Sequence, residues 1–296
     1  MFKRTFSALV GLLIVTGLLA GSAVHAQSVD AVISKMKAQY EQQLADIDTY
    51  VIETDQYTTY HRKVTTDGTA SYESRTQWKD SKGFMGGSFM GDMNSTMPSE
   101  DALNRLAENA TYGGTETIDG VQTHVLIVDD PSALSDDMMD EEDMNMPASE
   151  ETDNIQVGSM RFYVHADMHV PVRMDYDATV TREDGSSQKM NSVVTFTDYR
   201  TVDGLTIPYR TTMRMDNLNA SISPKEREEA RKSLDQLEKK MKEMNDRQRE
   251  MMEGMMSGQM DKLRQIVEEG TIEYTIQVQD VKVNTAIPDD VFTSTN

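Results

Sequence analysis

Three groups of side chains in this sequence have the types and spacing to do chemistry. The first is "HADMH", in which His165, Asp167 and His169 alternate along the chain. On one face of a straight strand, two imidazoles and a carboxylate could hold a zinc ion. The same stretch lies where one strand pattern stops and another starts, and a turn there would separate the three side chains. We therefore expect a polar turn and no metal site.

The second group is a serine among glycines in "GGSFMG", residues 86 to 91. This stretch does not fit the G-x-S-x-G pattern that exposes a nucleophilic serine on a strained turn. No combination of nucleophile, base and oxyanion donors is recognisable elsewhere in the chain. We expect a flexible loop here, no catalytic residue, no cofactor and a protein that is not an enzyme.

The third group is methionine, with 23 residues in the chain. One cluster lies at residues 85 to 97, one at 138 to 146, and one is "MMEGMMSGQM", residues 251 to 260. Thioethers can bind Cu(I), but no histidine or cysteine lies inside any cluster. Methionine also provides flexible apolar surface that adapts to a partner. We favour apolar contact and keep a Met-rich Cu(I)-binding protein as an alternative.

The composition and the first residues indicate an exported protein. Lys3 and Arg4 precede an apolar run from Phe6 to Ala20 and small residues up to Ala26, which predicts a signal peptide over 1–26, cleaved after Ala26. We expect a periplasmic or secreted protein, soluble after cleavage, with transient contact to a membrane. The chain has no cysteine, which excludes disulfides. Its net charge of −21 argues against nucleic acid as a partner.

The remaining residues, 27–296, read as a single, mainly β domain with helices. An amphipathic helix is expected over 28–47 and a short helix from Ser99 to Asn109. Strands are expected in the segments that alternate apolar and polar residues between tight turns, namely a long hairpin over 49–78 and strands at 110–128, 157–165, 170–181, 188–199, 205–216 and 271–283. The acidic stretch 129–156 predicts a disordered insertion.

A long helical insertion is expected over 224–269, before the last strand. Its apolar positions step alternately by four and three residues, at Ala230, Leu234, Leu237, Met241, Met244, Gln248, Met251 and Met255. Such a stripe needs a cover, which could be the protein's own sheet, the returning half of a helical hairpin, or a second chain. We favour a lid over the sheet.

Three stretches resemble a known superfamily: "RFYVHADMHVPVRMDYD" (161–177), "DYRTVDGLTIPYRTTMRM" (198–215) and "VKVNTAIPDDVF" (281–292). With the signal peptide and the first helix, they resemble the outer-membrane lipoprotein-sorting superfamily of Lol-carrier and RseB-like periplasmic proteins. The resemblance implies a curved antiparallel half-barrel whose concave apolar face carries acyl chains or senses lipoprotein.

The function we expect is therefore a non-catalytic carrier or binding protein for lipid or lipoprotein acyl chains. The alternative is an envelope sensor or adaptor that binds another protein through the long helix. The expected apolar contacts lie in the glycine-rich loop and the long helix, at Phe84, Met85, Phe89, Met90, Met244, Met251, Met252, Met255 and Met256.

Overall fold

The computed structural model describes residues 28–66, 69–79, 99–134, 152–182, 185–218, 224–245, 247, 260 and 264–293. Along the chain, the elements are α1 (Val29–Leu44), β1 (Thr49–Thr54), β2 (Tyr57–Thr66), β3 (Thr69–Trp78), α3 (Glu100–Asn109), β4 (Thr111–Ile118), β5 (Val121–Val128), η1 (Pro131–Leu134), β6 (Thr152–His165), β7 (Pro171–Arg182), β8 (Ser187–Val202), β9 (Leu205–Asp216), α4 (Pro224–Glu243), η3 (Gln265–Glu269), β10 (Thr271–Val283) and α6 (Asp290–Thr293). No helix in these ranges is long and apolar enough to cross a membrane.

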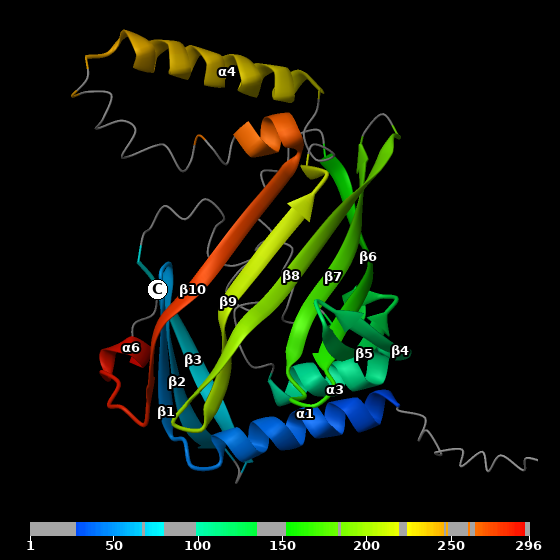
Figure 1. Ribbon diagram of the computed structural model, residues 1–296, viewed down its shortest axis with the longest axis vertical. Coiled ribbons are helices and arrows are strands. Elements are labelled where there is room, and N and C mark those ends of the chain that lie inside the picture. The colour runs from blue at the N-terminus through cyan, green and yellow to red at the C-terminus, as the bar shows by residue number, and fades with distance from the viewer. Residues whose placement is uncertain are drawn as a thin grey trace, which may run out of the picture.

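The strands form one ten-stranded sheet in the order β3-β2-β1-β10-β9-β8-β7-β6-β5-β4. Every neighbouring pair is antiparallel. The sheet is open and curved, and α1 crosses one end of it (Figure 1). The expected fold, a curved antiparallel half-barrel with an N-terminal helix against it, is confirmed.

Serine side chains begin both N-terminal helices, as the sequence predicts. The hydroxyl of Ser28 accepts the N–H of Ala31 at 3.2 Å, and that of Ser99 accepts the N–H of Ala102 at 3.1 Å. Each bond satisfies a backbone donor that the first helical turn would otherwise leave unpaired. Both helices then bury apolar side chains in the core that they share with the sheet.

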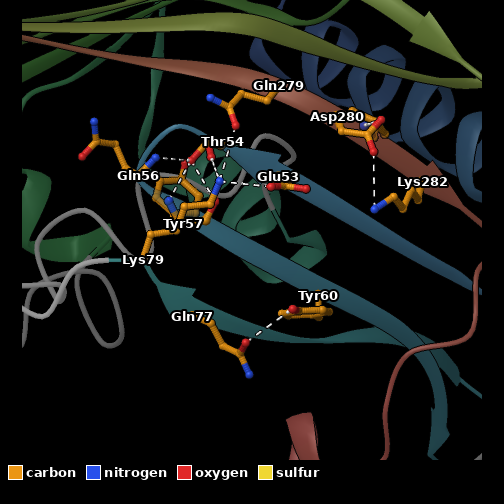
Figure 2. Close-up of polar contacts among 11 residues, drawn as sticks. Glu53, Thr54, Gln56, Tyr57, Tyr60, Gln77, Lys79, Gln279, Asp280 and Lys282 are labelled. Atoms are coloured by element: carbon orange, nitrogen blue, oxygen red, sulfur yellow. Dashed lines mark hydrogen bonds and ion pairs between the residues drawn. The ribbon is translucent and has the colours of Figure 1, made fainter.

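The long hairpin expected over 49–78 is wrong in one respect, because the chain makes three strands there. Thr54 ends β1 and forms the turn into β2 (Figure 2). Its hydroxyl accepts the N–H groups of Gln56 and Tyr57 at 3.1 and 3.0 Å and donates to the carbonyl of Tyr57 at 2.9 Å. These bonds replace strand pairing in a stretch that contains neither glycine nor proline.

The acidic segment is structured at both of its ends. Pro131–Leu134 form a 3-10 helix in which Leu134 is 5% exposed, and β6 begins at Thr152 rather than at the expected Val157. The expectation of disorder over 129–156 is therefore wrong for these two ends. Residues 135–151 lie outside the described part of the chain.

The helix at the start of the insertion is also shorter than the single helix expected over 224–269. α4 ends at Glu243, and the chain returns so that Arg264 pairs with Glu238 on α4. Figure 1 shows α4 beyond the end of β9 and β10 that lies opposite α1, with η3 beneath it. This arrangement is a fold-back against η3. The described part of α4 therefore does not have the position expected of a lid.

Candidate apolar binding face

One face of the sheet carries continuous apolar rows from strand to strand; we call it the inner face. Cross-strand pairing aligns the first row from β4 to β10, namely Tyr112, Leu126, Phe162, Met174, Val194, Met213 and Tyr274. The second row runs from β5 to β10 through Val128, Met160, Tyr176, Ser192, Met215 and Ile272. The two rows are two residues apart on each strand, so they share a face.

The two rows differ in burial. Every member of the second row is buried, with exposed fractions between 0% at Val128 and 8% at Tyr176. In the first row, Phe162, Met174 and Tyr274 are only half-buried. Side chains of α1 and α3 belong to the same core as both rows. The first row is thus a partly covered apolar surface beside a fully covered core.

Next to the two rows, the opposite, outer face is largely polar on β7, β8 and β9. On β7, Arg173 pairs with Asp175 at 2.5 Å, and on β9 Arg214 pairs with Asp216 at 3.0 Å. Between these strands, Thr195 of β8 bonds the carbonyl of Thr212 at 3.4 Å. On these three strands the apolar rows therefore lie on the inner face, whereas on β5 and β6 the outer face also buries Val125 and Tyr163.

Methionines contribute strongly to the inner face. Met160, Met190, Met213 and Met215 are buried there, and Met36 of α1 is buried in the same core. Our sequence analysis missed them because it followed the dense methionine clusters of the loops and the long helix. The available signal was the alternation of Met213 and Met215 with Arg214, which places both methionines on one face of a strand.

Of the residues expected to contact a ligand, the structure describes only Met244. Phe84, Met85, Phe89, Met90, Met251, Met252, Met255 and Met256 lie outside the described residues. Met244 is described and half-buried just beyond α4, where its N–H donates to the carbonyl of Met241 at 3.2 Å. It is not part of the core that contains the two rows.

The "HADMH" stretch forms the expected turn between β6 and β7. The N–H of His165 donates to the carbonyl of Val170 at 2.8 Å, which closes the turn. Nδ1 of His165 accepts the N–H groups of Asp167 and Met168 at 3.1 and 3.3 Å. One ring nitrogen of His165 therefore holds the turn together, and within the described ranges no three acidic or histidine side chains gather as a metal site would require.

A serine–histidine pair that we did not anticipate lies at the edge of the sheet. Nδ1 of His61 on β2 is 2.7 Å from the hydroxyl of Ser74 on β3, and the two residues are cross-strand partners. The His61 ring is stacked on the Tyr50 ring. Burial lowers the pKa of His61 to about 4, so its imidazole is neutral at physiological pH. The stacking and burial give this pair a structural role.

Comparisons with known proteins leave the function to be argued from geometry. No protein-family model matches the chain. No curated protein matches it. Among solved structures, it is similar to a protein described as a DUF1329 family protein from Desulfovibrio piger, over 89% of this chain and 96% of that one, with 12% identity and a TM-score of 0.40. A likeness this distant carries no argument about what the protein binds.

Proposed function

We propose that this protein is a non-catalytic carrier or binding protein for lipid or lipoprotein acyl chains, which bind against the inner face. The observation that carries the proposal is the half-buried part of the first row. Phe162, Met174 and Tyr274 leave apolar surface accessible beside a buried core. On the outer face, Met174 has the charged neighbours Arg173 and Asp175, so the apolar surface of this strand is confined to one side.

Methionine suits such a ligand for a physical reason. Its unbranched side chain has several rotatable bonds and follows an irregular apolar shape at little cost. A flexible hydrocarbon chain presents such a shape, and each square ångström of apolar surface it buries stabilises the complex by about 25 cal/mol. Met174 is flanked on its row by Phe162 and Val194, which gives an acyl chain a continuous apolar track across three strands.

The proposed setting is the cell envelope. The signal peptide expected over 1–26 would export the protein, and the resemblance to the lipoprotein-sorting superfamily points to the same compartment. A second candidate function is a sensor or adaptor that binds another envelope protein through the helical insertion. One observation favours it: α4 lies beyond the sheet and exposes charged side chains such as Lys232 and Asp235.

Substitutions on the two faces test the proposal. Met174→Gln keeps the length of the side chain but adds an amide to the first row, whereas Thr195→Gln adds the same amide to the outer face. Burying an amide without a partner costs about 1 to 3 kcal/mol. We therefore expect Met174→Gln to weaken binding of a fluorescent fatty-acid analogue about fivefold or more, and Thr195→Gln to change it less than twofold. Equal affinities for both variants, each shown to be folded by circular dichroism, would contradict the proposal.

A further inference from the structure

Helix α1 carries two buried hydrogen-bond donors that find no acceptor among the described residues. Tyr40 is 6% exposed and Gln43 is 8% exposed. Neither the hydroxyl of Tyr40 nor Nε2 of Gln43 has a hydrogen-bond partner within the described part of the chain. Residues three apart lie on the same face of a helix, so both groups point to the same side. Buried polar groups without partners are rare and costly, and such a pair needs an explanation.

The orientation of the Gln43 amide is fixed by a backbone group. Its Oε1 accepts the N–H of Thr206, near the start of β9, at 2.9 Å. Nε2 is therefore the end of the amide that remains unpaired, and it can only donate. The contact also holds α1 against β9, so this donor has a defined position.

Burial and, to a smaller extent, the nearby Tyr40 raise the pKa of Tyr199, but Tyr199 uses its own proton elsewhere. The hydroxyl of Tyr199 donates to the carbonyl of Pro171. Burial raises the pKa of Tyr40, so its phenol is protonated at every physiological pH and is a neutral donor. Of these two buried tyrosines, Tyr199 has its hydroxyl paired, and Tyr40 has no partner among the described residues.

Two neutral donors on one side of a helix favour one kind of ligand atom, an oxygen that accepts both bonds. A carboxylate would bring a buried negative charge to donors that carry no positive charge, which is costly. A neutral carbonyl oxygen accepts two hydrogen bonds without that cost. Tyr40 belongs to the same hydrophobic core as Val194 and Met213 of the first row.

We propose that Tyr40 and Gln43 bind the neutral carbonyl oxygen of an ester- or amide-linked acyl chain. This inference rests on the proposed function, because it places the head of the chain whose tail lies on the inner face. The protein then selects esterified or amide-linked chains over free fatty acids, whose carboxylate is charged at neutral pH.

Three probes with the same fluorophore separate the head from the tail: the methyl ester of pyrene-dodecanoic acid, the free acid, and dodecylpyrene. Each is titrated into the purified full-length protein and followed by fluorescence. Wild type should bind the ester about three to ten times more tightly than dodecylpyrene, the size expected for one or two neutral hydrogen bonds. Its affinity for the ester should also exceed its affinity for the free acid.

The paired tyrosines supply the variant and its control. Tyr40→Phe should abolish the preference for the ester and leave the affinity for dodecylpyrene within twofold of wild type. It should not lower the melting temperature of the free protein, because it removes a buried hydroxyl that has no partner. Tyr199→Phe loses the bond to Pro171, so it should lower the melting temperature and keep the preference for the ester.

The outcomes separate this inference from the proposed function. An ester preference that survives in Tyr40→Phe overturns the role of Tyr40 and Gln43, while binding of dodecylpyrene still supports the apolar face. A lower melting temperature of free Tyr40→Phe with unchanged ester binding would show that the hydroxyl holds a structural water, which also overturns the inference. If wild type binds none of the three probes, the proposed function fails, and the inference fails with it.

Discussion

The imidazole of His61 lies flat against the phenol ring of Tyr50, with 4.2 Å between the ring centroids and 10° between the ring planes. Both residues are buried, Tyr50 at 4% and His61 at 6% exposure. Their strands are neighbours in the sheet, and β1 also pairs with the C-terminal strand β10. The stack therefore lies next to the join between the two ends of the chain, where a loss of packing would open the sheet.

Acidification should destabilise this region through His61. Burial lowers the pKa of His61 to about 4, whereas the unfolded chain has a histidine pKa near 6.5. Between these values the unfolded state binds more protons, so the free energy of unfolding falls as the pH drops. The stability gained from the neutral imidazole is fully present above pH 6.5, and about 3 kcal/mol of it is lost by pH 4. Urea unfolding at a series of pH values measures it.

His61→Phe is the control for that effect, because phenylalanine keeps an aromatic ring beside Tyr50 and does not titrate. The variant should show a shallower fall in stability between pH 6.5 and 4. Some dependence should remain, since burial also lowers the pKa of His124 and of His169. A pH dependence equal to that of wild type would mean that His61 is not the group responsible.

The turn at Thr54 should depend on one hydroxyl. Thr54 is 1% exposed and its hydroxyl makes three hydrogen bonds to the backbone of Gln56 and Tyr57. Thr54→Val keeps the shape of the side chain, loses all three bonds and leaves buried backbone groups unpaired. We expect a loss of about 2 to 3 kcal/mol in the free energy of unfolding, measured by urea denaturation.

Thr59 on β2 provides a matched control for Thr54. It is also buried, at 6% exposure, but it lies within the regular part of β2 and takes no part in the turn. Thr59→Val should therefore leave stability unchanged or raise it slightly. Similar losses in the two variants would indicate that hydroxyl burial, rather than the turn, determines the effect.

Local signals in the sequence were sufficient for much of the fold. The turns at Asp119-Gly120 and Asp203-Gly204 have positive φ at both residues, which is the geometry that Asp-Gly favours in tight hairpins. The last strand has the expected bounds, Thr271–Val283. These features depend on residues that are close together in the sequence, so their pattern can be read directly.

Features that depend on distant residues could not be read in the same way. The pairing of Tyr50 with Val283 joins β1 to the last strand, β10. Nothing in the sequence of either strand indicates which other strand it pairs with. The turn at Thr54 contains no glycine or proline, the residues that usually indicate a turn in a sequence. The two donors on α1 were invisible for a similar reason, since only the packed structure shows that the hydroxyl of Tyr40 is left without an acceptor.

The methionines of the long insertion can be tested against the copper alternative. Replacing Met251, Met252, Met255 and Met256 together by leucine nearly preserves volume and polarity. If these thioethers form apolar surface, the variant should bind the fluorescent fatty-acid analogue as wild type does. Titration with Cu(I) under reducing conditions checks the alternative. Tight, stoichiometric binding that the leucine variant loses would favour copper as the ligand.

Removing the helical insertion should leave the sheet intact. Leu234, Met260 and Val267 are buried, but outside the core that contains the two rows. The base of the insertion is already closed, because the N–H of Leu218 donates to the carbonyl of Gly270 at 2.8 Å and Asp216 pairs with Thr271. A short glycine–serine linker in place of residues 225–263 should therefore change the melting temperature by less than about 3 °C, as expected when few core contacts are lost.

The same deletion distinguishes the three partners that could cover the apolar stripe of the long helix. A fold-back against η3 predicts a stable monomer before and after the deletion, with unchanged binding of an apolar dye. A lid predicts a clear gain in dye binding and a large loss of stability, because removing it would uncover the first row. A dimerising helix predicts that wild type sediments as a dimer and the variant as a monomer. We expect the first result, since Arg264 already pairs with Glu238 within one chain and brings the returning segment against α4.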